Sequence, residues 1–250
     1  MTRPRWHLPD PGAEVDLPAG TEGYHYLSRV VRLRRNEEVA FFCGDGKDYI
    51  YRLVEADRDR LRLVLDHSET VYADPPFLLE IWIPNLKGNA TEDVIRSVVP
   101  LGVSGIRVYS SKRAVSKPTR DRTLRRQKVA DEAVRQCGRT VQAKVYPGEG
   151  SLTDLLGTLE GRSGIIFHEK ADRELPDVLK DPAAAGKPWI RSGLVVVTGP
   201  EGGFTDEEIQ FTRNAGLVAS RLGPTILRAE LAPVVASALI GSFLWTCKDH

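Results

Sequence analysis

The chain has 250 residues, of which 41% are hydrophobic and 28% charged, and its formal net charge is +1. This composition is that of an ordinary globular protein with a sizeable core in one large domain or two smaller ones, and its overall charge gives no sign of a nucleic-acid partner. The cysteines Cys43, Cys137 and Cys247 are too few and too scattered for a disulfide framework or a zinc site, so we predict no metal and expect a reducing cytoplasm.

The first seventy or so residues are predicted to form a small β structure. The chain begins with prolines and charges where a secretory signal needs an apolar core. The strand pattern of Glu38–Cys43 is followed by the turn Gly44–Asp48 and a second strand pattern over Tyr49–Ala56, which predicts a hairpin. Residues Arg60–Asp66 alternate between apolar and polar, so one face of that strand is expected to contact water. Short strands and tight turns favour a barrel.

The segment Tyr72–Phe77 is the predicted linker, because its two adjacent prolines are incompatible with a helix or a central strand. After it, strand patterns alternate with helix patterns, and the helix Ala90–Val99 is predicted to open at Thr91. The predicted strands are Phe77–Ile83, Gly105–Ser110, Val141–Tyr146, Gly164–Glu169 and Leu194–Val197. The further predicted helices are Arg120–Gln136 and Leu152–Leu159. This alternation predicts an α/β domain with a mainly parallel sheet.

Positive charge is concentrated in the middle of the chain. Between Arg96 and Lys144 there are thirteen lysines and arginines against three acidic residues. A local basic surface of this kind suits the phosphate backbone of a nucleic acid. The alternative is an ordinary solvated helix face.

The segment Thr198–Gln210, with the sequence TGPEGGFTDEEIQ, is the most informative part of the chain. It follows an apolar strand and forms a glycine-rich turn that side chains do not crowd. Thr205 and Glu208 then have the spacing of a capping box, which predicts the start of a helix. A glycine-rich turn between a strand and a helix exposes backbone N–H groups to a ligand. The alternative is a tight turn with no ligand.

The segment Leu222–Leu239 contains a second Gly-Pro turn, followed by Arg228, Glu230 and an apolar helix. If the two turns end neighbouring strands, they can line one pocket. The apolar stretch Leu231–Cys247 is just shorter than a membrane span and is interrupted by proline, glycine and serine. We therefore expect a buried or dimer-facing helix and no membrane partner.

Four motifs occur in order along the chain: YHYLSRVVRLRRNEEV at Tyr24–Val39, DEAVRQCGR at Asp131–Arg139, GPEGG at Gly199–Gly203 and LGPTILRAE at Leu222–Glu230. Together they resemble the motifs of the RsmE-type family in the SPOUT class of RNA methyltransferases. That family methylates N3 of a uridine in 16S (small-subunit) ribosomal RNA. The resemblance extends over most of the chain, and it did not follow from composition or periodicity.

The resemblance implies a fold, a cofactor and partners. We expect a PUA-like RNA-binding β-barrel over residues 1–73 and a SPOUT α/β methyltransferase domain over 74–250, whose C-terminal strands are tied into a trefoil knot. We also expect a homodimer in the cytoplasm that binds 16S ribosomal RNA or the small ribosomal subunit, and loops that hold S-adenosyl-L-methionine. The cofactor-binding residues implied are Phe167, His168, Glu169, Thr198, Gly199, Pro200, Glu201, Gly202, Gly203, Leu222, Gly223, Ile226 and Leu227.

The catalytic residues implied are Arg228, Glu230 and Glu201. Uridine N3 is a poor nucleophile while it is protonated, so methyl transfer needs the proton removed or the resulting anion stabilised. Arg228 is the predicted cation for that charge or for a phosphate, and its alternative role is an ion pair with Glu230 or Glu201. Either glutamate is a candidate to orient the cofactor or act as a base, and the sequence selects neither. Glu201 has a further alternative as a cap of backbone N–H groups, and His168 as a structural histidine.

Eight residues are predicted to contact RNA. A contact with a phosphate positions the RNA and does not read its sequence. The alternative for the helical members is a polar packing face. The eight predicted RNA contacts are Arg29, Arg32, Arg34, Arg35, Arg125, Arg126, Gln136 and Arg139.

The chain departs from the family pattern near these surfaces. A family lysine and glutamate fall on Ser97 and Pro100, and Pro100 is expected to end its helix early. A family arginine is Thr225 here. These changes leave open a SPOUT enzyme that acts on another base or on transfer RNA, or a catalytically silent RNA-binding relative. A dinucleotide-dependent oxidoreductase is disfavoured, because no G-x-G-x-x-G follows the first strand of the α/β region.

Overall fold

The computed structural model describes residues 3–111, 120–147, 150–181 and 193–246. The chain forms two compact units. The N-terminal unit contains Met1–Asp74 and Val134–Gln142, and the C-terminal unit contains Pro75–Ala133 and Ala143–His250. The first crossing between the units therefore lies inside the predicted linker. The membership of Val134–Gln142 in the N-terminal unit was not anticipated from the sequence.

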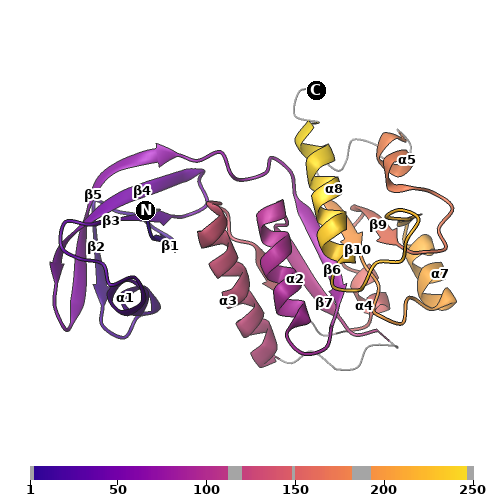
Figure 1. Ribbon diagram of the computed structural model, residues 1–250, viewed down its shortest axis with the longest axis horizontal. Helices are drawn as coiled ribbons and strands as arrows, with labels where there is room; N and C mark the ends of the chain where they lie inside the picture. The colour runs from indigo at the N-terminus through magenta and orange to yellow at the C-terminus, as the bar shows by residue number, and fades with distance from the viewer. Residues whose placement is uncertain (1–2, 112–119, 148–149, 182–192, 247–250) are drawn as a thin grey trace. The chain divides into compact units, whose positions relative to one another are not determined.

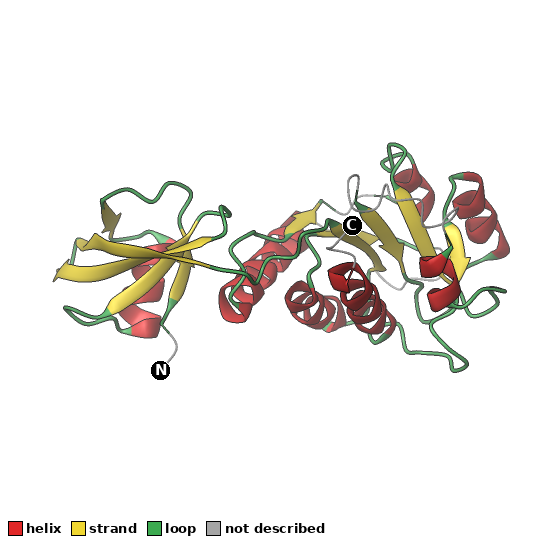
Figure 2. Cartoon of the chain, turned by 90° about the horizontal axis from the view of Figure 1, so that it is seen from above, coloured by secondary structure: helices red, strands yellow, loops and turns green. Residues whose placement is uncertain are grey.

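The N-terminal unit is built on a curled five-stranded sheet with the strand order β1-β3-β4-β5-β2 (Figure 2). Its strands are β1 (Arg5–His7), β2 (Glu14–Pro18), β3 (Glu38–Phe42), β4 (Lys47–Ala56) and β5 (Arg60–Thr70). β3 and β4 form the predicted antiparallel hairpin, whereas β1 pairs with β3 in parallel. β1 and β2 form the two edges of the sheet.

A helical segment, which the sequence patterns did not predict, packs against this sheet. It consists of α1 (Glu22–His25) and the π-helical turn η1 (Tyr26–Val31), and Arg32 ends it in a left-handed conformation with φ of 57°. Leu27 is fully buried in one apolar cluster with strand residues such as Val39 and Leu63. This cluster is the core of the N-terminal unit.

The C-terminal unit contains a six-stranded sheet with the order β11-β9-β10-β6-β7-β8, and every pairing in it is parallel. The strands are β6 (Leu79–Pro84), β7 (Gly105–Tyr109), β8 (Lys144–Tyr146), β9 (Ser163–Phe167), β10 (Leu194–Val197) and β11 (Val218–Ser220). The helices are α2 (Ala90–Val98), η2 (Val99–Leu101), α3 (Arg120–Cys137), α4 (Leu152–Leu156), α5 (Leu175–Lys180), α7 (Asp206–Asn214) and α8 (Ala232–Thr246). The predicted α/β fold with a parallel sheet is confirmed.

The middle strands β6 and β10 are buried along their whole lengths. Helix α8 packs on α2 and β6 (Figure 1) and buries Ala236 and Ile240 completely. It approaches so closely that a Cβ at Gly241 would lie 2.9 Å from the carbonyl oxygen of Leu101. None of the helices that the structure describes is both long and apolar enough to cross a membrane.

The structure corrects the predicted start of α2. The helix begins at Ala90 after Asn89, and Thr91 is not its cap. The Thr91 hydroxyl instead accepts a 3.0 Å hydrogen bond from the backbone N–H of Leu86, because the preceding loop folds back on it. The effect of Pro100 is as predicted, since the α-helix ends at Val98 and Pro100 lies in η2.

Candidate active site

One cavity of about 790 Å³ lies in the C-terminal unit and is lined by segments that follow β9, β10 and β11. Because the three strands are parallel, their carboxyl ends meet at one edge of the sheet. The sequence suggested that the two Gly-Pro turns follow neighbouring strands. They do not, because β9 lies between β10 and β11 in the sheet. The residues after β9 therefore lie between the two turns.

The loop after β10 is fixed at both ends. Thr198 is fully buried, its N–H donates to the carbonyl of Trp82 at 3.1 Å, and its own carbonyl accepts from the hydroxyl of Tyr109 at 2.7 Å. At the other end, Thr205 and Glu208 form the predicted capping box at the start of α7. Gly203 closes the turn with φ of +68°, where a side chain would be strained. The backbone of this loop is thus held in one shape against the cavity.

Aromatic packing forms the wall between the β9 and β10 segments. A Cβ at Gly199 would lie 3.0 Å from the ring of Phe204, so a larger residue there would require the ring to shift. The ring of Phe204 meets that of His168 edge-on, with ring centres 6.4 Å apart. His168 is 9% exposed, and its Nε2 lies 3.8 Å from Oε1 of Glu169. His168 thus lines the cavity as part of a packed wall.

Arg221 begins the third wall and was not selected from the sequence. Its guanidinium pairs with Glu174 at 2.8 Å, while its buried Nε has no hydrogen-bond partner among the described residues. An unpaired buried N–H is a donor available to a ligand. The only sequence signal was its position directly before the Leu222–Glu230 motif. Within that motif Ile226 is 85% exposed.

The predicted catalytic residues Arg228, Glu230 and Glu201 are exposed and line this same cavity. Within the described residues, no ion pair joins the guanidinium of Arg228 to any carboxylate, so the alternative pairing with Glu230 or Glu201 is absent. All predicted cofactor-binding residues also line the cavity, except Thr198, which lies beneath the loop. The cavity combines backbone groups, apolar side chains and the guanidinium of Arg228, which makes no ion pair with the described residues, and this fits a ligand with a flat ring and polar edges.

Arg29, Arg32, Arg34 and Arg35 are exposed on the N-terminal unit, and no ion pair of their side chains occurs among the described residues. Other arginines of this unit do pair with carboxylates. Examples are Arg3–Glu38, Arg5–Asp48, Arg52–Glu38 and Arg62–Glu14. The segment 29–35 therefore keeps four uncompensated positive charges in seven residues.

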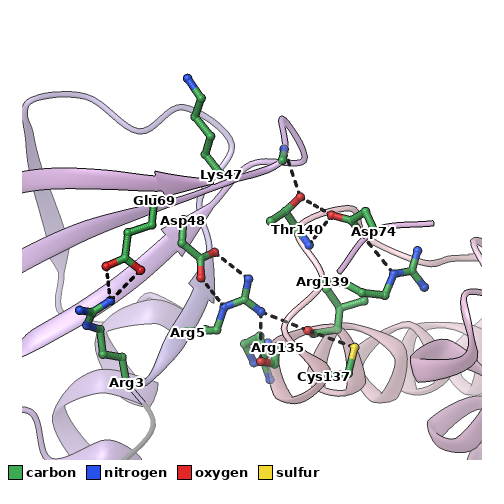
Figure 3. Close-up of polar contacts among 12 residues, drawn as sticks. Arg3, Arg5, Lys47, Asp48, Glu69, Asp74, Arg135, Cys137, Arg139 and Thr140 are labelled. Atoms are coloured by element: carbon green, nitrogen blue, oxygen red, sulfur yellow. Dashed lines mark hydrogen bonds and ion pairs between the residues drawn. The ribbon is translucent and has the colours of Figure 1, made fainter. Parts of the chain in front are cut away.

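The structure corrects two predicted RNA contacts, because Arg126 and Arg139 are each 2% exposed. Within the N-terminal unit, Arg139 donates from Nε to Asp74 at 3.3 Å, and the N–H of Thr140 donates to the same carboxylate at 2.8 Å (Figure 3). Arg126 donates to Oδ1 of Asn85 at 2.5 Å in the C-terminal unit. Both guanidinium groups are therefore buried and bind partners inside their own unit.

The other two predicted contacts on α3 remain candidates. Arg125 is exposed and donates to Oδ1 of Asn89 at 3.0 Å. Gln136 is also exposed.

Comparisons with known proteins agree with this geometry. The family profile described as "RNA methyltransferase domain" matches residues 74–241, and that described as "RNA methyltransferase PUA domain" matches residues 20–66. The chain is 32% identical to the ribosomal RNA small subunit methyltransferase E of Mycobacterium bovis over 94% of its length and 88% of that protein. It is 28% identical to the protein of the same name from Synechocystis, over 94% of this chain and 76% of that one.

A solved structure is also similar. The ribosomal RNA small subunit methyltransferase E of Neisseria gonorrhoeae, crystallised with S-adenosyl methionine, is 29% identical and superposes with a TM-score of 0.84. The match covers 96% of this chain and 98% of that one.

Proposed function

Because the chain belongs to the family of ribosomal RNA small subunit methyltransferase E proteins, we propose that it transfers the methyl group of S-adenosyl-L-methionine to N3 of a uridine in 16S ribosomal RNA. The observation that carries the proposal is the single cavity that gathers the GPEGG and LGPTILRAE segments. Together they provide backbone groups on two sides and charged groups at the rim.

The cofactor would be held mainly by backbone. The segments Gly199–Gly203 and Leu222–Leu227 are the ones that line the cavity with glycine and exposed peptide groups. The buried Nε of Arg221 is a further donor, and Phe204 and Leu222 supply apolar surface. When bound, S-adenosyl-L-methionine supplies an electrophilic methyl carbon on a sulfonium ion.

Arg228 is the proposed electrostatic catalyst. Loss of the N3 proton places negative charge on the uracil ring and its carbonyl oxygens, and a guanidinium close to them lowers the energy of that anion. Among the described residues Arg228 has no carboxylate partner that would neutralise its positive charge, and this supports the role. Glu201 and Glu230 line the same cavity, as does Glu169, and they are the candidates to accept the proton.

Arg29, Arg32, Arg34 and Arg35 make no ion pair with the described residues, and this supports RNA binding by the N-terminal unit. Each phosphate that they neutralise releases counterions, so binding should weaken as salt rises. The match of residues 20–66 to a PUA domain supports the same surface. We propose that this unit closes into the PUA-like barrel of the family and that it positions the RNA backbone.

Three further properties follow from the family as proposals. The C-terminal strands form a trefoil knot, the active protein is a homodimer, and it acts in the cytoplasm. The exposed apolar side chains Leu239 and Trp245 on α8 support a helix that packs against a second copy.

A second reading is a SPOUT enzyme for another base or for transfer RNA. The observation that favours it is Thr225, which lies at the cavity where the family has an arginine and is exposed. A catalytically silent RNA-binding relative is the remaining alternative.

The test combines binding and product analysis. Isothermal titration with S-adenosylmethionine and S-adenosylhomocysteine should show one site per chain or per dimer. Incubation with undermethylated small subunits or with 16S ribosomal RNA, followed by nucleoside analysis, should then yield 3-methyluridine. A different methylated nucleoside would support the second reading. Cofactor that does not bind to folded protein, with or without RNA, would support the silent relative.

A further inference from the structure

The loop Asn85–Asn89 follows β6 and is outside the cavity described above. β6 is the direct neighbour of β10, and Trp82 pairs with Val197 in the parallel register. The residues after Pro84 therefore leave the sheet at the same edge as the GPEGG segment. Neither the sequence motifs nor the proposed cofactor site assigns this loop a role.

The loop is held in place from several directions. The N–H of Asn85 donates to the carbonyl of Tyr109 at 2.9 Å, and its Oδ1 accepts from buried Arg126. The N–H of Leu86 donates to Thr91. At the far end, Oδ1 of Asn89 accepts from Arg125. Two successive arginines of α3 thus hold the first and last residues of one loop.

Positive charge at this loop is largely uncompensated. Lys87 is exposed at its middle, and its ammonium group makes no ion pair or hydrogen bond within the described part of the chain. The nearby carboxylate of Asp93 is already paired with Arg96 at 2.7 Å. Glu92 is buried, and its Oε1 lies 3.7 Å from Nε of Arg126, too far for a hydrogen bond.

Two buried atoms of that pair have no hydrogen-bond partner among the described residues, namely Nε of Arg126 and Oε2 of Glu92. Arg126 is thus retained in the interior without full hydrogen bonding, which costs free energy. In addition, the N-terminus of α2 starts at this loop and has no side-chain cap. The unsatisfied N–H groups of a helix N-terminus favour a bound anion.

From these contacts we propose that Asn85–Asn89 is a phosphate-binding loop for the RNA strand beside the target nucleotide. Lys87 and Arg125 contact the phosphate, and Arg126 is a positioning residue that fixes Asn85 and thereby the loop. The proposal rests on the proposed function, because it takes RNA as the substrate. Flexible cations outside the cofactor cavity suit a phosphate, whose contacts set the register of the RNA.

The experiment compares Lys87→Ala with Lys180→Ala, which removes the same charge from an exposed site at the end of α5. Binding to undermethylated small subunits is measured over a series of salt concentrations, and S-adenosylmethionine binding is measured by titration. Lys87→Ala should reduce the slope of log affinity against log salt by about 0.7 to 1, the value for one lost phosphate contact. Lys180→Ala should leave the slope unchanged, and both variants should bind the cofactor normally.

A double-mutant cycle tests the role of Arg126. Arg126→Met should weaken RNA binding while cofactor binding is retained, and its combination with Lys87→Ala should weaken RNA binding no more than the stronger single change. Independent sites would give additive effects instead. Additivity would therefore overturn the positioning role. Arg125→Gln is a second variant with an exposed side chain and should also lower the salt slope.

Three results would overturn the phosphate site. In the first, Lys87→Ala has the same RNA affinity and salt slope as Lys180→Ala. In the second, Lys87→Ala loses cofactor binding as well as RNA binding. In the third, the wild-type protein does not bind RNA. In the first two cases an active wild-type enzyme would leave the proposed function intact. A wild-type protein that binds RNA with the predicted dependence on Lys87 but methylates nothing would instead remove the proposed function alone.

Discussion

The hydroxyl of Tyr109 donates a 2.7 Å hydrogen bond to the carbonyl of Thr198, and both residues are fully buried. Tyr109 ends β7, whereas Thr198 is the residue at which β10 becomes the GPEGG loop. Burial, together with the negative charge of Glu208, raises the pKa of Tyr109 well above its ordinary value. The hydroxyl therefore remains a donor at any working pH, and it ties the GPEGG loop to a strand two positions away in the sheet.

Replacing Tyr109 with Phe should destabilise the protein by about 1–3 kcal/mol, because the buried carbonyl of Thr198 loses its partner. The affinity for S-adenosylmethionine should fall as well, since the loop is no longer fixed at its start. Urea denaturation and calorimetric titration measure the two effects. Tyr72→Phe is the control, because Tyr72 is 86% exposed. If the two variants have the same stability and the same affinity for S-adenosylmethionine, the hydrogen bond does not hold the loop.

Gly199→Ala should abolish or strongly weaken cofactor binding. The new Cβ would lie 3.0 Å from the ring of Phe204, which is itself packed against His168, so the cavity wall must shift. Gly157→Ala is the matched control, since the nearest atom to its Cβ would be at 3.6 Å and its φ is not positive. Titration with the cofactor distinguishes them. Full binding by Gly199→Ala would place the cofactor elsewhere.

Arg228→Ala should leave the fold and the cofactor affinity intact and reduce turnover by about a hundredfold or more, the cost of removing one oxyanion-stabilising group. Single-turnover methylation with saturating RNA measures the chemical step. Arg213→Ala removes an equally exposed arginine from α7 and should be silent. If turnover is unchanged, Arg228 has no part in the chemistry.

Glu80 should make stability depend on acid pH. Burial would raise the pKa of this carboxyl, but hydrogen bonds from Arg162, Trp82 and Arg107 outweigh it and lower the pKa below its ordinary value. A carboxyl group whose pKa is lower in the folded than in the unfolded protein stabilises the fold. This stabilisation is complete at pH values above the unfolded pKa of about 4.3, and it is lost as the pH falls through the folded pKa. Glu80→Gln should cost about 3 kcal/mol at pH 7, because two arginines lose their counter-charge.

The free energy of unfolding of Glu80→Gln should differ less from that of the wild type at low pH. Denaturation at neutral pH and below pH 4 tests this, with the exposed pair member Glu55→Gln as the control. A constant difference across that range would mean that the charge of Glu80 does not contribute.

Local signals predicted local structure well. The capping box of Thr205 and Glu208 depends on residues three apart, and it occurs as predicted. Thr91 carried a similar signal and was assigned wrongly, because its hydroxyl is used by Leu86 in a loop whose shape is set by tertiary contacts. The π-helical turn Tyr26–Val31 has no simple sequence signature and was missed.

The family motifs predicted that the GPEGG and LGPTILRAE segments would line one cavity, and they do. Most of its residues lie in two short motifs, whereas Arg221 and the burial of Arg126 depend on residues distant in sequence. The partner of Arg126 is Asn85, which is 41 residues away. The strand order could not be predicted either, since nothing in the sequence places β9 between β10 and β11.

The membership of Val134–Gln142 in the N-terminal unit has a consequence for how this protein can be divided or recombined. A fragment that stops at Asp74 would leave its carboxylate without Thr140 and Arg139, and the N–H of Gly46 without the hydroxyl of Thr140. The PUA-containing half is therefore not a cassette that a gene fusion could transfer intact. The N-terminal unit includes Val134–Gln142, which interrupts the sequence of the C-terminal unit, so neither unit is one continuous segment of the chain.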